Sequence, residues 1–446
     1  MKRLFGTLLL LLIVATGYSQ APKYIFYFIG DGMGPSHVLG TELYLGEMQG
    51  VIGRPQKLCF TQFPESAFVT TYSATNGVTD SAASGTALAT GHKSYNGAIG
   101  VDSDTVPVYS VAVDLAEKGM AIGIATSVPI NHATPAAFYA HNVHRDNYPQ
   151  IATWMEKANF DFYAGGDVRC NNNQEREDIY RSAEKNGYTI VRGFDDFKKR
   201  GDKAEKMMLF QENVAIELPY AINRNDNDLT LAQITEAGID FLSDKSDKGF
   251  FMMIEGGKID YAAHNDDGAT VFQEVLDLNE AVKVALEFYN KHKDETLIIV
   301  TADHETGGLV LGYHGDYILR LKELGTQKVS YEKLVDLLKS EKETTWGRVS
   351  EIVKENIGVG IRGEHNADEK VTMEDGLAKK IAREAIYDIN RKAILSWASG
   401  NHSGTFVPLF AIGKGAENFN GVIDNTDIPR IIRKITTEKS KKSKRR

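Results

Sequence analysis

The sequence contains few cysteines and no excess of positive charge. Only Cys59 and Cys170 occur among 446 residues, so a scaffold of several disulfides is excluded. Neither lies in a zinc-binding pattern, and the sequence leaves open whether they form a disulfide or stay as unpaired thiols. The formal net charge is -9, which argues against nucleic-acid binding because an acidic surface repels polyanions. Any phosphate site must therefore be made locally positive by metals or arginine.

No apolar run is long enough to cross a bilayer comfortably, including residues 8–15 near the start of the chain. Lys2 and Arg3 precede this run and small residues follow it, an order typical of a secretory signal peptide. We therefore predict that residues 1–20 are a signal peptide and that the protein is exported to the periplasm or secreted, without stable membrane insertion. An uncleaved membrane anchor is the alternative. Residues 437–446 are predicted to be a solvated basic tail, with attachment to a polyanion as the alternative.

Between the ends, apolar segments typical of buried strands alternate with segments of helical periodicity. Strands are predicted at residues 23–29, 67–71, 121–126, 250–254, 296–301 and 407–412. Helices are predicted at residues 82–90, 111–118, 229–242 and 269–289. This alternation indicates an α/β fold with a central, mostly parallel sheet flanked by helices.

Two stretches interrupt the alternation. Residues 171–228 are polar and are predicted to be loops that contain short strand candidates at 188–191 and 207–210. Residues 315–392 are predicted to be a helical insertion that covers a sheet edge or the site, or that supplies a subunit contact. No internal repeat or flexible linker divides the chain, so residues 21–436 are predicted to form a single catalytic domain that includes the insertion 315–392.

Ser81 directly precedes the predicted helix 82–90 and follows Asp80. The first N–H groups of a helix and the positive end of its dipole favour an anion at this position. A serine hydroxyl needs a base or a metal to become a nucleophile, and no G-x-S-x-G turn surrounds Ser81. Taken alone, an Asp-Ser pair before a helix is more commonly only a helix cap.

Carboxylate and imidazole side chains follow or neighbour several of the predicted strands. The set comprises Asp31, Glu255, the pair Asp260 and His264, the pair Asp303 and His304, and His402. Asp260 and His264 stand four residues apart, so on a helical turn they share one face and could bind one cation. Because ligands gather at the carboxyl ends of parallel strands, we expect this set to meet at one edge of the sheet. Mixed nitrogen and oxygen ligands suit Zn²⁺, and an all-oxygen set suits Mg²⁺.

Six motifs make residues 24–415 resemble the alkaline phosphatase family. They are residues 31–34, 78–97, 131–145, 250–264, 301–308 and 400–404. The resemblance implies the α/β fold of that superfamily, with the insertion 315–392 in the place of its variable crown. It also implies hydrolysis of small-molecule phosphate monoesters to an alcohol and inorganic phosphate, through a phosphoserine intermediate. A homodimer is one option, and the physiological ester is not indicated.

The resemblance also implies roles for individual residues. Ser81 would be the nucleophile and Arg145 would bind two oxygens of the phosphate. One zinc ion would be bound by Asp260, His264 and His402, and a second by Asp31, Asp303 and His304. A magnesium ion would be bound by Thr134 and Glu255, with Asp31 as a bridge.

Two positions differ from the best-known bacterial members. His132 stands where some members carry an aspartate ligand of the third metal, so we expect it beside the ligand set, as in the animal branch. Tyr261 stands where other members have a lysine or histidine near the phosphate, and we expect it in a similar supporting place. The identity of the third ion is left open by these differences.

Other hydrolases of the same superfamily are the first alternative. Sulfatases need a Cys/Ser-x-Pro-x-Arg context, and the residues after Ser81 lack that proline. Phosphodiesterases of the superfamily usually lack the third-metal ligands and the arginine that Arg145 represents. The second alternative is a non-catalytic protein that binds metal or phosphate, which the complete set of catalytic residues disfavours.

Overall fold

A central ten-stranded sheet runs through the computed structural model, which describes residues 21–313 and 317–437. The strand order is β16-β2-β15-β8-β1-β7-β3-β4-β6-β5. Neighbouring strands are parallel except where β15 pairs with β2 and with β8. The strands are β1 (Tyr24–Gly30), β2 (Glu65–Thr70), β3 (Ala121–Thr126), β4 (Phe162–Gly165), β5 (Tyr188–Arg192), β6 (Lys206–Phe210), β7 (Phe250–Gly256), β8 (Thr296–Ala302), β15 (Val407–Gly413) and β16 (Gly421–Asp424). The predicted α/β fold with a mostly parallel sheet is confirmed.

The three central strands, β8, β1 and β7, are buried along their whole length, as their continuous apolar sequences predict. Their register aligns Gly30 of β1 with Gly256 of β7 and with Ala302 of β8. The residues that follow β1 and β8, together with the last residues of β7, therefore emerge at the same edge of the sheet. The candidate site forms at this edge.

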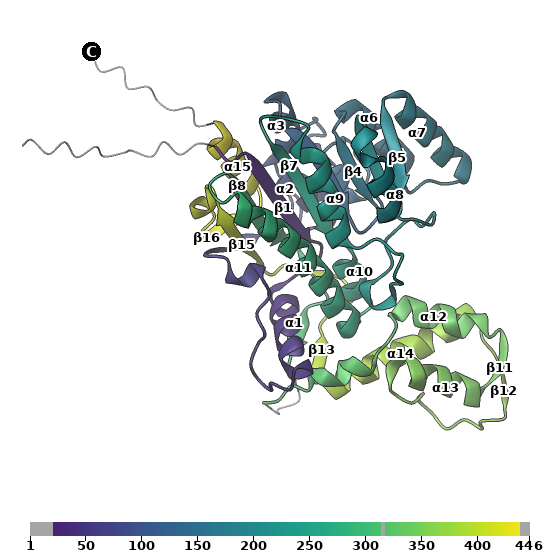
Figure 1. Cartoon of the computed structure of the whole chain (residues 1–446). Helices are drawn as coiled ribbons and strands as arrows, with labels where there is room; N and C mark the ends of the chain where they lie inside the picture. The colour runs from purple at the N-terminus through teal and green to yellow at the C-terminus, as the bar shows by residue number, and fades with distance from the viewer. Residues whose placement is uncertain (1–20, 314–316, 438–446) are drawn as a thin grey trace, which may run out of the picture.

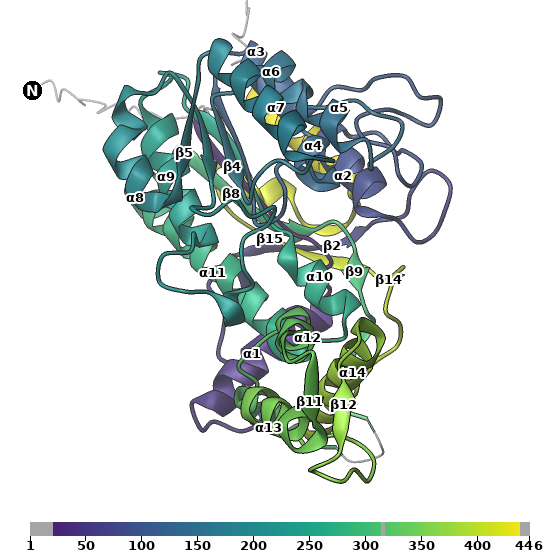
Figure 2. The same cartoon turned by 90° about the vertical axis from the view of Figure 1, so that its right-hand side faces the viewer.

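Helices cover both faces of the sheet. Figure 2 shows α9 and α11 on one side and α2 and α4 on the other. The helices are α1 (Pro35–Met48), α2 (Ser81–Thr90), α3 (Val111–Glu117), α4 (Ala133–Ala136), α5 (Tyr148–Ala152), α6 (Trp154–Ala158), α7 (Asn173–Lys185), α8 (Gly193–Arg200), α9 (Leu231–Ser243), α10 (Lys258–His264), α11 (Gly268–Lys291), α12 (Tyr331–Ser340), α13 (Trp346–Ile357), α14 (Asp375–Ala393) and α15 (Asp427–Thr437). No helix in residues 21–313 and 317–437 is long and apolar enough to cross a membrane.

Over residues 171–228 the two strand candidates at 188–191 and 207–210 are confirmed as β5 and β6, but the prediction of loops around them misses two helices. This stretch contains α7 and α8, and its strands β5 and β6 form the end of the central sheet. The reason is that α7, for example, buries only Ile179 and Ala183 and so leaves no clear apolar pattern.

The insertion packs against the end of the molecule that carries the site edge (Figure 1). Its described part, residues 317–392, contains α12, α13 and most of α14, together with a small sheet of β11 (Glu343–Thr345) and β12 (Lys370–Thr372). The other short strands are β9 (Glu305–Thr306), β10 (Leu309–Leu311), β13 (Leu395–Trp397) and β14 (His402–Ser403). The predicted signal peptide 1–20 and residues 438–446 of the predicted tail lie outside the described residues. Cys59 and Cys170 are both free.

Candidate active site

Three carboxylates meet at the site edge of the sheet because each belongs to the end of a central strand. Asp31 follows β1, Asp303 follows β8, and Glu255 is the last residue but one of β7. None of the three side chains is exposed. The turn after β1 requires glycine at position 32, since its φ is +72° and a Cβ there would lie 2.9 Å from the Asp260 Cα and the Thr306 Oγ1. The Gly32 N–H donates to Asp303 Oδ1 at 3.1 Å, which joins the two strand ends.

The first candidate cation set consists of Asp31, Asp303 and His304, whose ligand atoms lie within 4.8 Å of one another. His304 Nε2 is 3.4 Å from Asp31 Oδ1 and 3.2 Å from Asp303 Oδ2. Both oxygens of Asp31 and Oδ2 of Asp303 are buried without a hydrogen-bond partner. Burial raises the pKa of both carboxyl groups well above the usual range and lowers the pKa of His304 well below its usual range. Buried, unpaired carboxylates are costly, and a bound cation would remove that cost.

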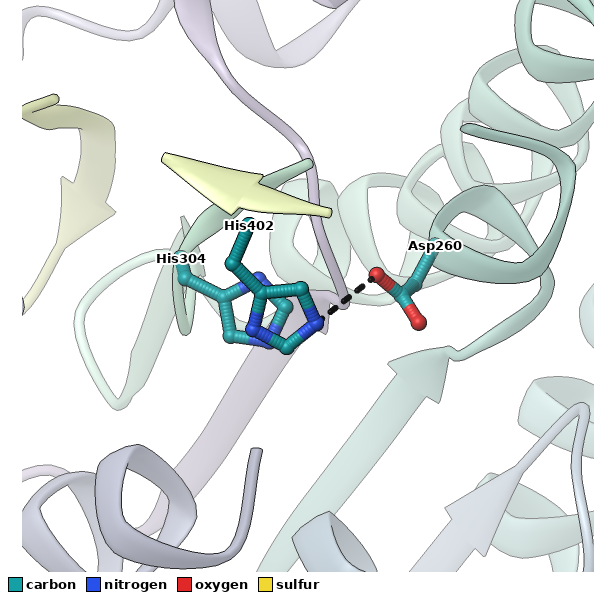
Figure 3. A group of neighbouring side chains, drawn as sticks. All are labelled: Asp260, His304 and His402. Carbon is teal, nitrogen blue, oxygen red and sulfur yellow. Dashed lines mark ion pairs between the residues drawn. The ribbon is translucent and has the colours of Figure 1, made fainter. Parts of the chain in front are cut away.

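In the second set, ligand atoms of Asp260, His304 and His402 lie within 4.8 Å of one another. The group expected from the sequence, Asp260, His264 and His402, overlaps this set. His264 Nε2 lies 3.3 Å from Asp260 Oδ2 and 3.3 Å from His402 Nε2, and His402 Nε2 lies 3.7 Å from Asp260 Oδ1. Figure 3 shows the His304 and His402 rings lying face to face, with Asp260 approaching them from α10. The ring centroids are 3.6 Å apart, so the first set and this expected group are adjacent. A hydrogen bond with Asp260 raises the pKa of His264 to about 9.

Backbone carbonyl oxygens orient two of these histidines. Nδ1 of His264 lies 2.8 Å from the Gly400 oxygen, and Nδ1 of His402 lies 2.8 Å from the Thr79 oxygen. A ring whose Nδ1–H donates to a carbonyl presents Nε2 as the free ligand atom. Both Nε2 atoms therefore face the cluster.

Thr306 connects the two sets, and the sequence analysis did not single it out. Its hydroxyl donates to Asp260 Oδ1 at 2.5 Å and lies 3.2 Å from His304 Nδ1. Thr306 is fully buried in β9, directly opposite His402 of β14. Its place in the motif 301–308 was the only sequence signal, because threonine is neither a typical zinc ligand nor titratable.

Ser81 begins α2, as the sequence predicts, and its hydroxyl lies 3.2 Å from His304 Nε2. Asp80 caps the helix by accepting from the Ala83 N–H at 3.0 Å. The same carboxylate accepts from Arg145 Nη1 at 2.9 Å, so Asp80 also positions the guanidinium. This second role of Asp80 was missed, since Arg145 is 65 residues away in the sequence.

The third set shares Asp31 with the first. Ligand atoms of Asp31, His132 and Glu255 lie within 4.8 Å of one another, and the buried Thr134 hydroxyl has no hydrogen-bond partner. Burial raises the pKa of Glu255 to about 7, while burial and the Arg145 charge lower the pKa of His132 to about 3. His132 is thus a neutral imidazole at ligand distance from these carboxylates.

His132 contacts one cationic and one aromatic side chain. Its Nε2 faces Arg145 Nη2 at 3.2 Å, and its ring meets the Tyr261 ring edge-on with centroids 5.8 Å apart. Tyr261 therefore lies beside the third set through His132. Nine of the ten residues expected at the site are joined, with these two neighbours, by the contacts described above. The tenth, Thr134, lies in α4, for which His132 is the N-cap.

Comparison with known proteins agrees with this geometry. The sequence profile of the alkaline phosphatase family matches residues 22–437. Alkaline phosphatase 4 of Bacillus subtilis is 33% identical over 425 residues, which cover 93% of this chain and 88% of the relative. The crystal structure of the cold-active alkaline phosphatase from the psychrophile Shewanella sp. matches with a TM-score of 0.80 and 30% identity, covering 93% of this chain and 100% of that chain.

The alkaline phosphatase of the Antarctic bacterium TAB5 matches with a TM-score of 0.67 and 27% identity, covering 94% of this chain and 99% of that chain. Variants of the TAB5 enzyme with glutamate or aspartate in place of a histidine have Mg bound in their M3 site. The family match extends over nearly all the described residues, and the site holds clustered nitrogen and oxygen ligands. The chain therefore belongs to the alkaline phosphatase family and is a metal-binding phosphoric monoester hydrolase.

Proposed function

We propose that the protein hydrolyses small phosphate monoesters through a phosphoserine formed on Ser81, at a site for two zinc ions and one magnesium ion. The observation that supports this most strongly is the position of the Ser81 hydroxyl, 3.2 Å from His304 Nε2 and at the start of α2. An anion that approaches Ser81 meets the helix N-terminus and the nearby ligand sets together.

The donor atoms fit the proposed ions. Asp260, His264 and His402 would bind one zinc ion, and Asp31, Asp303 and His304 the other, both with mixed nitrogen and oxygen donors. Asp31, Thr134 and Glu255 would bind magnesium through oxygen atoms. When bound, these ions would neutralise phosphate charge, lower the pKa of the serine hydroxyl and of water, and stabilise the departing oxygen. The buried oxygen atoms without hydrogen-bond partners support this occupancy.

Ser81 and Arg145 carry out the substrate chemistry in this proposal. The Ser81 hydroxyl loses its proton to water and its oxygen attacks phosphorus. The new O–P bond forms as the ester P–O bond breaks, and the departing oxygen leaves from the opposite side and takes a proton from water to become the alcohol. The planar fork of Arg145 binds two of the non-bridging oxygens and keeps phosphorus in line with Ser81. Water then attacks the phosphoserine, which releases inorganic phosphate and restores the Ser81 hydroxyl.

The identity of the third ion depends on His132. The TAB5 variants that hold Mg in M3 have a carboxylate in place of a histidine. In the present chain His132 lies beside Asp31 and Glu255, so an imidazole is available to that set. Magnesium at this position, together with export and a homodimer, stays a prediction.

Trapping the phosphoserine tests the proposal. The protein, supplied with zinc and magnesium, is mixed with a phosphate monoester, quenched in acid and digested, and its peptides are analysed by mass spectrometry. We expect phosphate on the peptide that contains Ser81, and we expect Ser81→Ala to lose most turnover while it retains its zinc. Unchanged turnover in Ser81→Ala, or phosphate on another residue, would refute the assignment of the nucleophile.

A further inference from the structure

The loop formed by residues 265–267 links two helices next to the site. It follows α10, a helix of seven residues that carries Asp260 and ends at His264. It precedes α11, for which Asp267 is the N-cap. Asp266 has a φ of +54°, so the chain changes direction within the loop. The orientation of His264, at the last position of a short helix, depends on how firmly this loop is held, because helix ends fray.

Each of the three loop residues makes a side-chain hydrogen bond with the insertion. Asn265 Nδ2 donates to Glu332 Oε1 of α12 at 2.7 Å. The Asp266 carbonyl accepts from Asn390 Nδ2 of α14 at 2.6 Å. The Asp267 carboxylate accepts from Gln327 Nε2 at 2.8 Å and from the Tyr331 N–H at 2.9 Å. In Figure 2, α12 and α14 accordingly lie directly beside α10.

The contacts of Asp267 are buried, and those of Asn265 and Asp266 are partly buried. Asp267 is 1% exposed, Asn390 3% and Gln327 6%. A Cβ at Gly268 would lie 2.8 Å from Asn390 Oδ1, so glycine allows α14 to approach the start of α11. Hydrogen bonds shielded from water in this way contribute more to rigidity than exposed ones, and leaving one partner unpaired is costly.

The other zinc set is held differently. Asp31 and Asp303 directly follow β1 and β8, whose backbones are paired with their neighbours along their whole length. His304 comes next in the chain, and its N–H donates to Asp303 Oδ1. This set is thus positioned by the sheet. The ligands on α10 are also contacted by Thr306, at Asp260, and by the Gly400 carbonyl, at His264, but the carboxyl end of the helix continues directly into the loop 265–267.

We propose that the insertion is a positioning element for one metal site. Through Glu332, Asn390 and the residues around Gln327 it fixes the loop 265–267, and through that loop it holds Asp260 and His264 in ligand geometry. This inference rests on the proposed function, because it takes Asp260, His264 and His402 as the ligands of one zinc ion.

The test compares variants of the full-length protein that remove single contacts. Asn265 Nδ2 also donates to the Tyr261 carbonyl at 3.0 Å, within its own helix turn. Glu332→Ala removes only the acceptor that the insertion offers to Asn265, whereas Glu332→Gln keeps a side-chain oxygen that can accept the same hydrogen bond. Tyr220→Phe removes the other bond of Glu332, in which the Tyr220 hydroxyl donates at 2.8 Å, and leaves Asn265 untouched. Asn390→Ala removes an independent contact with the loop.

A matched control weakens the insertion elsewhere. Val353 is fully buried in α13, so Val353→Ala opens a cavity in the insertion without removing any of the four hydrogen bonds to the loop. Thermal unfolding of all variants after metal removal shows how much each change destabilises the fold. The control separates a specific effect on α10 from general loosening.

The readout is zinc affinity at each of the two sites, measured by competition with a chelator on protein loaded with zinc and magnesium. We expect Glu332→Ala and Asn390→Ala to lower the affinity for zinc at one of the two sites by about 10- to 100-fold. This is the usual effect of losing a residue that orients metal ligands. The second zinc ion should bind with wild-type affinity. Glu332→Gln, Tyr220→Phe and Val353→Ala should bind both ions as the wild type does.

Two results would overturn the inference. Wild-type zinc affinity in both Glu332→Ala and Asn390→Ala would show that the loop does not control the ligands, and an equal loss in Val353→Ala would show a merely structural effect. Asp260→Ala tests separately whether Asp260 is a zinc ligand, which the inference takes from the proposed function. If Asp260→Ala binds zinc as the wild type does, the ligand assignment itself is wrong; if it loses one zinc ion while the loop variants do not, only the role of the insertion is refuted.

Discussion

Replacing Arg145 by alanine should weaken phosphate binding while leaving the zinc sites intact. Arg145 Nη1 donates to Asp80 Oδ2 at 2.9 Å, and Nη2 faces His132. Asp80 also accepts from the N–H groups of Ala83 and Gly97. Loss of the guanidinium therefore leaves the Asp80 cap of α2 in place, and Ser81 should keep its position.

The size of the effect follows from the hydrogen bonds that Arg145 would make. A hydrogen bond to a charged group contributes about 1.5–3 kcal/mol, and a fork that binds two phosphate oxygens makes two of them. Because the guanidinium is already paired with Asp80, we expect only part of this sum, about 2–4 kcal/mol. At about 1.4 kcal/mol for each factor of ten, phosphate binding should weaken by roughly 30- to 700-fold.

The assay is the inhibition constant of inorganic phosphate, with kcat/KM for an aryl phosphate measured on the same samples. Elemental analysis gives the zinc content, which should equal that of the wild type. Arg145→Lys keeps the charge but not the planar fork, so it should fall between the wild type and Arg145→Ala. An inhibition constant within about twofold of the wild type, or loss of zinc from Arg145→Ala, would refute the assignment of Arg145 to the substrate.

Two further predictions concern metal content and pH. His402→Ala should lower bound zinc by about one ion per chain because His402 completes the set with Asp260 and His264; a full complement by elemental analysis would show that it is not a ligand. Burial, together with the Asp277 charge, raises the pKa of Glu274 to about 7 from an ordinary value of 4.5. The folded protein retains a proton there that the unfolded chain loses, so this group's stabilisation declines as pH rises from about 4.5 to about 7. Glu274→Gln should remove that decline, so the substitution should raise the Tm more at about pH 8 than at about pH 5. The corresponding difference in the free energy of unfolding is up to about 3 kcal/mol. An equal change in Tm at both pH values would contradict the reasoning.

The strands that present the site were predictable from the sequence. Residues 23–29, 250–254 and 296–301 are continuous apolar runs. Runs of this length are typical of strands that are buried on both faces of a parallel sheet. Once these were recognised as parallel strands, Asp31, Glu255 and Asp303 had to emerge at one edge. The structure then brings their side chains together, with the register that aligns Gly30 with Gly256.

Contacts between side chains far apart in the sequence were not predictable. Asn265 and Glu332 are 67 residues apart, and neither has a pattern that indicates its partner. Thr306, which joins Asp260 and His304, looks like an ordinary strand residue. The strand candidates at 188–191 and 207–210 were recognised and correspond to β5 and β6, whereas α7 and α8 were taken for loops because α7, for example, buries only Ile179 and Ala183 and so leaves no clear apolar pattern.

Substrate class is the most direct test of the site as a whole. The measurement is the ratio of kcat/KM for an aryl phosphate monoester to kcat/KM for the matching diester, on purified protein with zinc and magnesium at mildly alkaline pH. Arg145 and the third ligand set should favour the additional charge of a monoester, so we predict a ratio strongly in favour of the monoester. A ratio near one, or in favour of the diester, would contradict the roles given to Arg145 and to the third set of Asp31, Thr134 and Glu255.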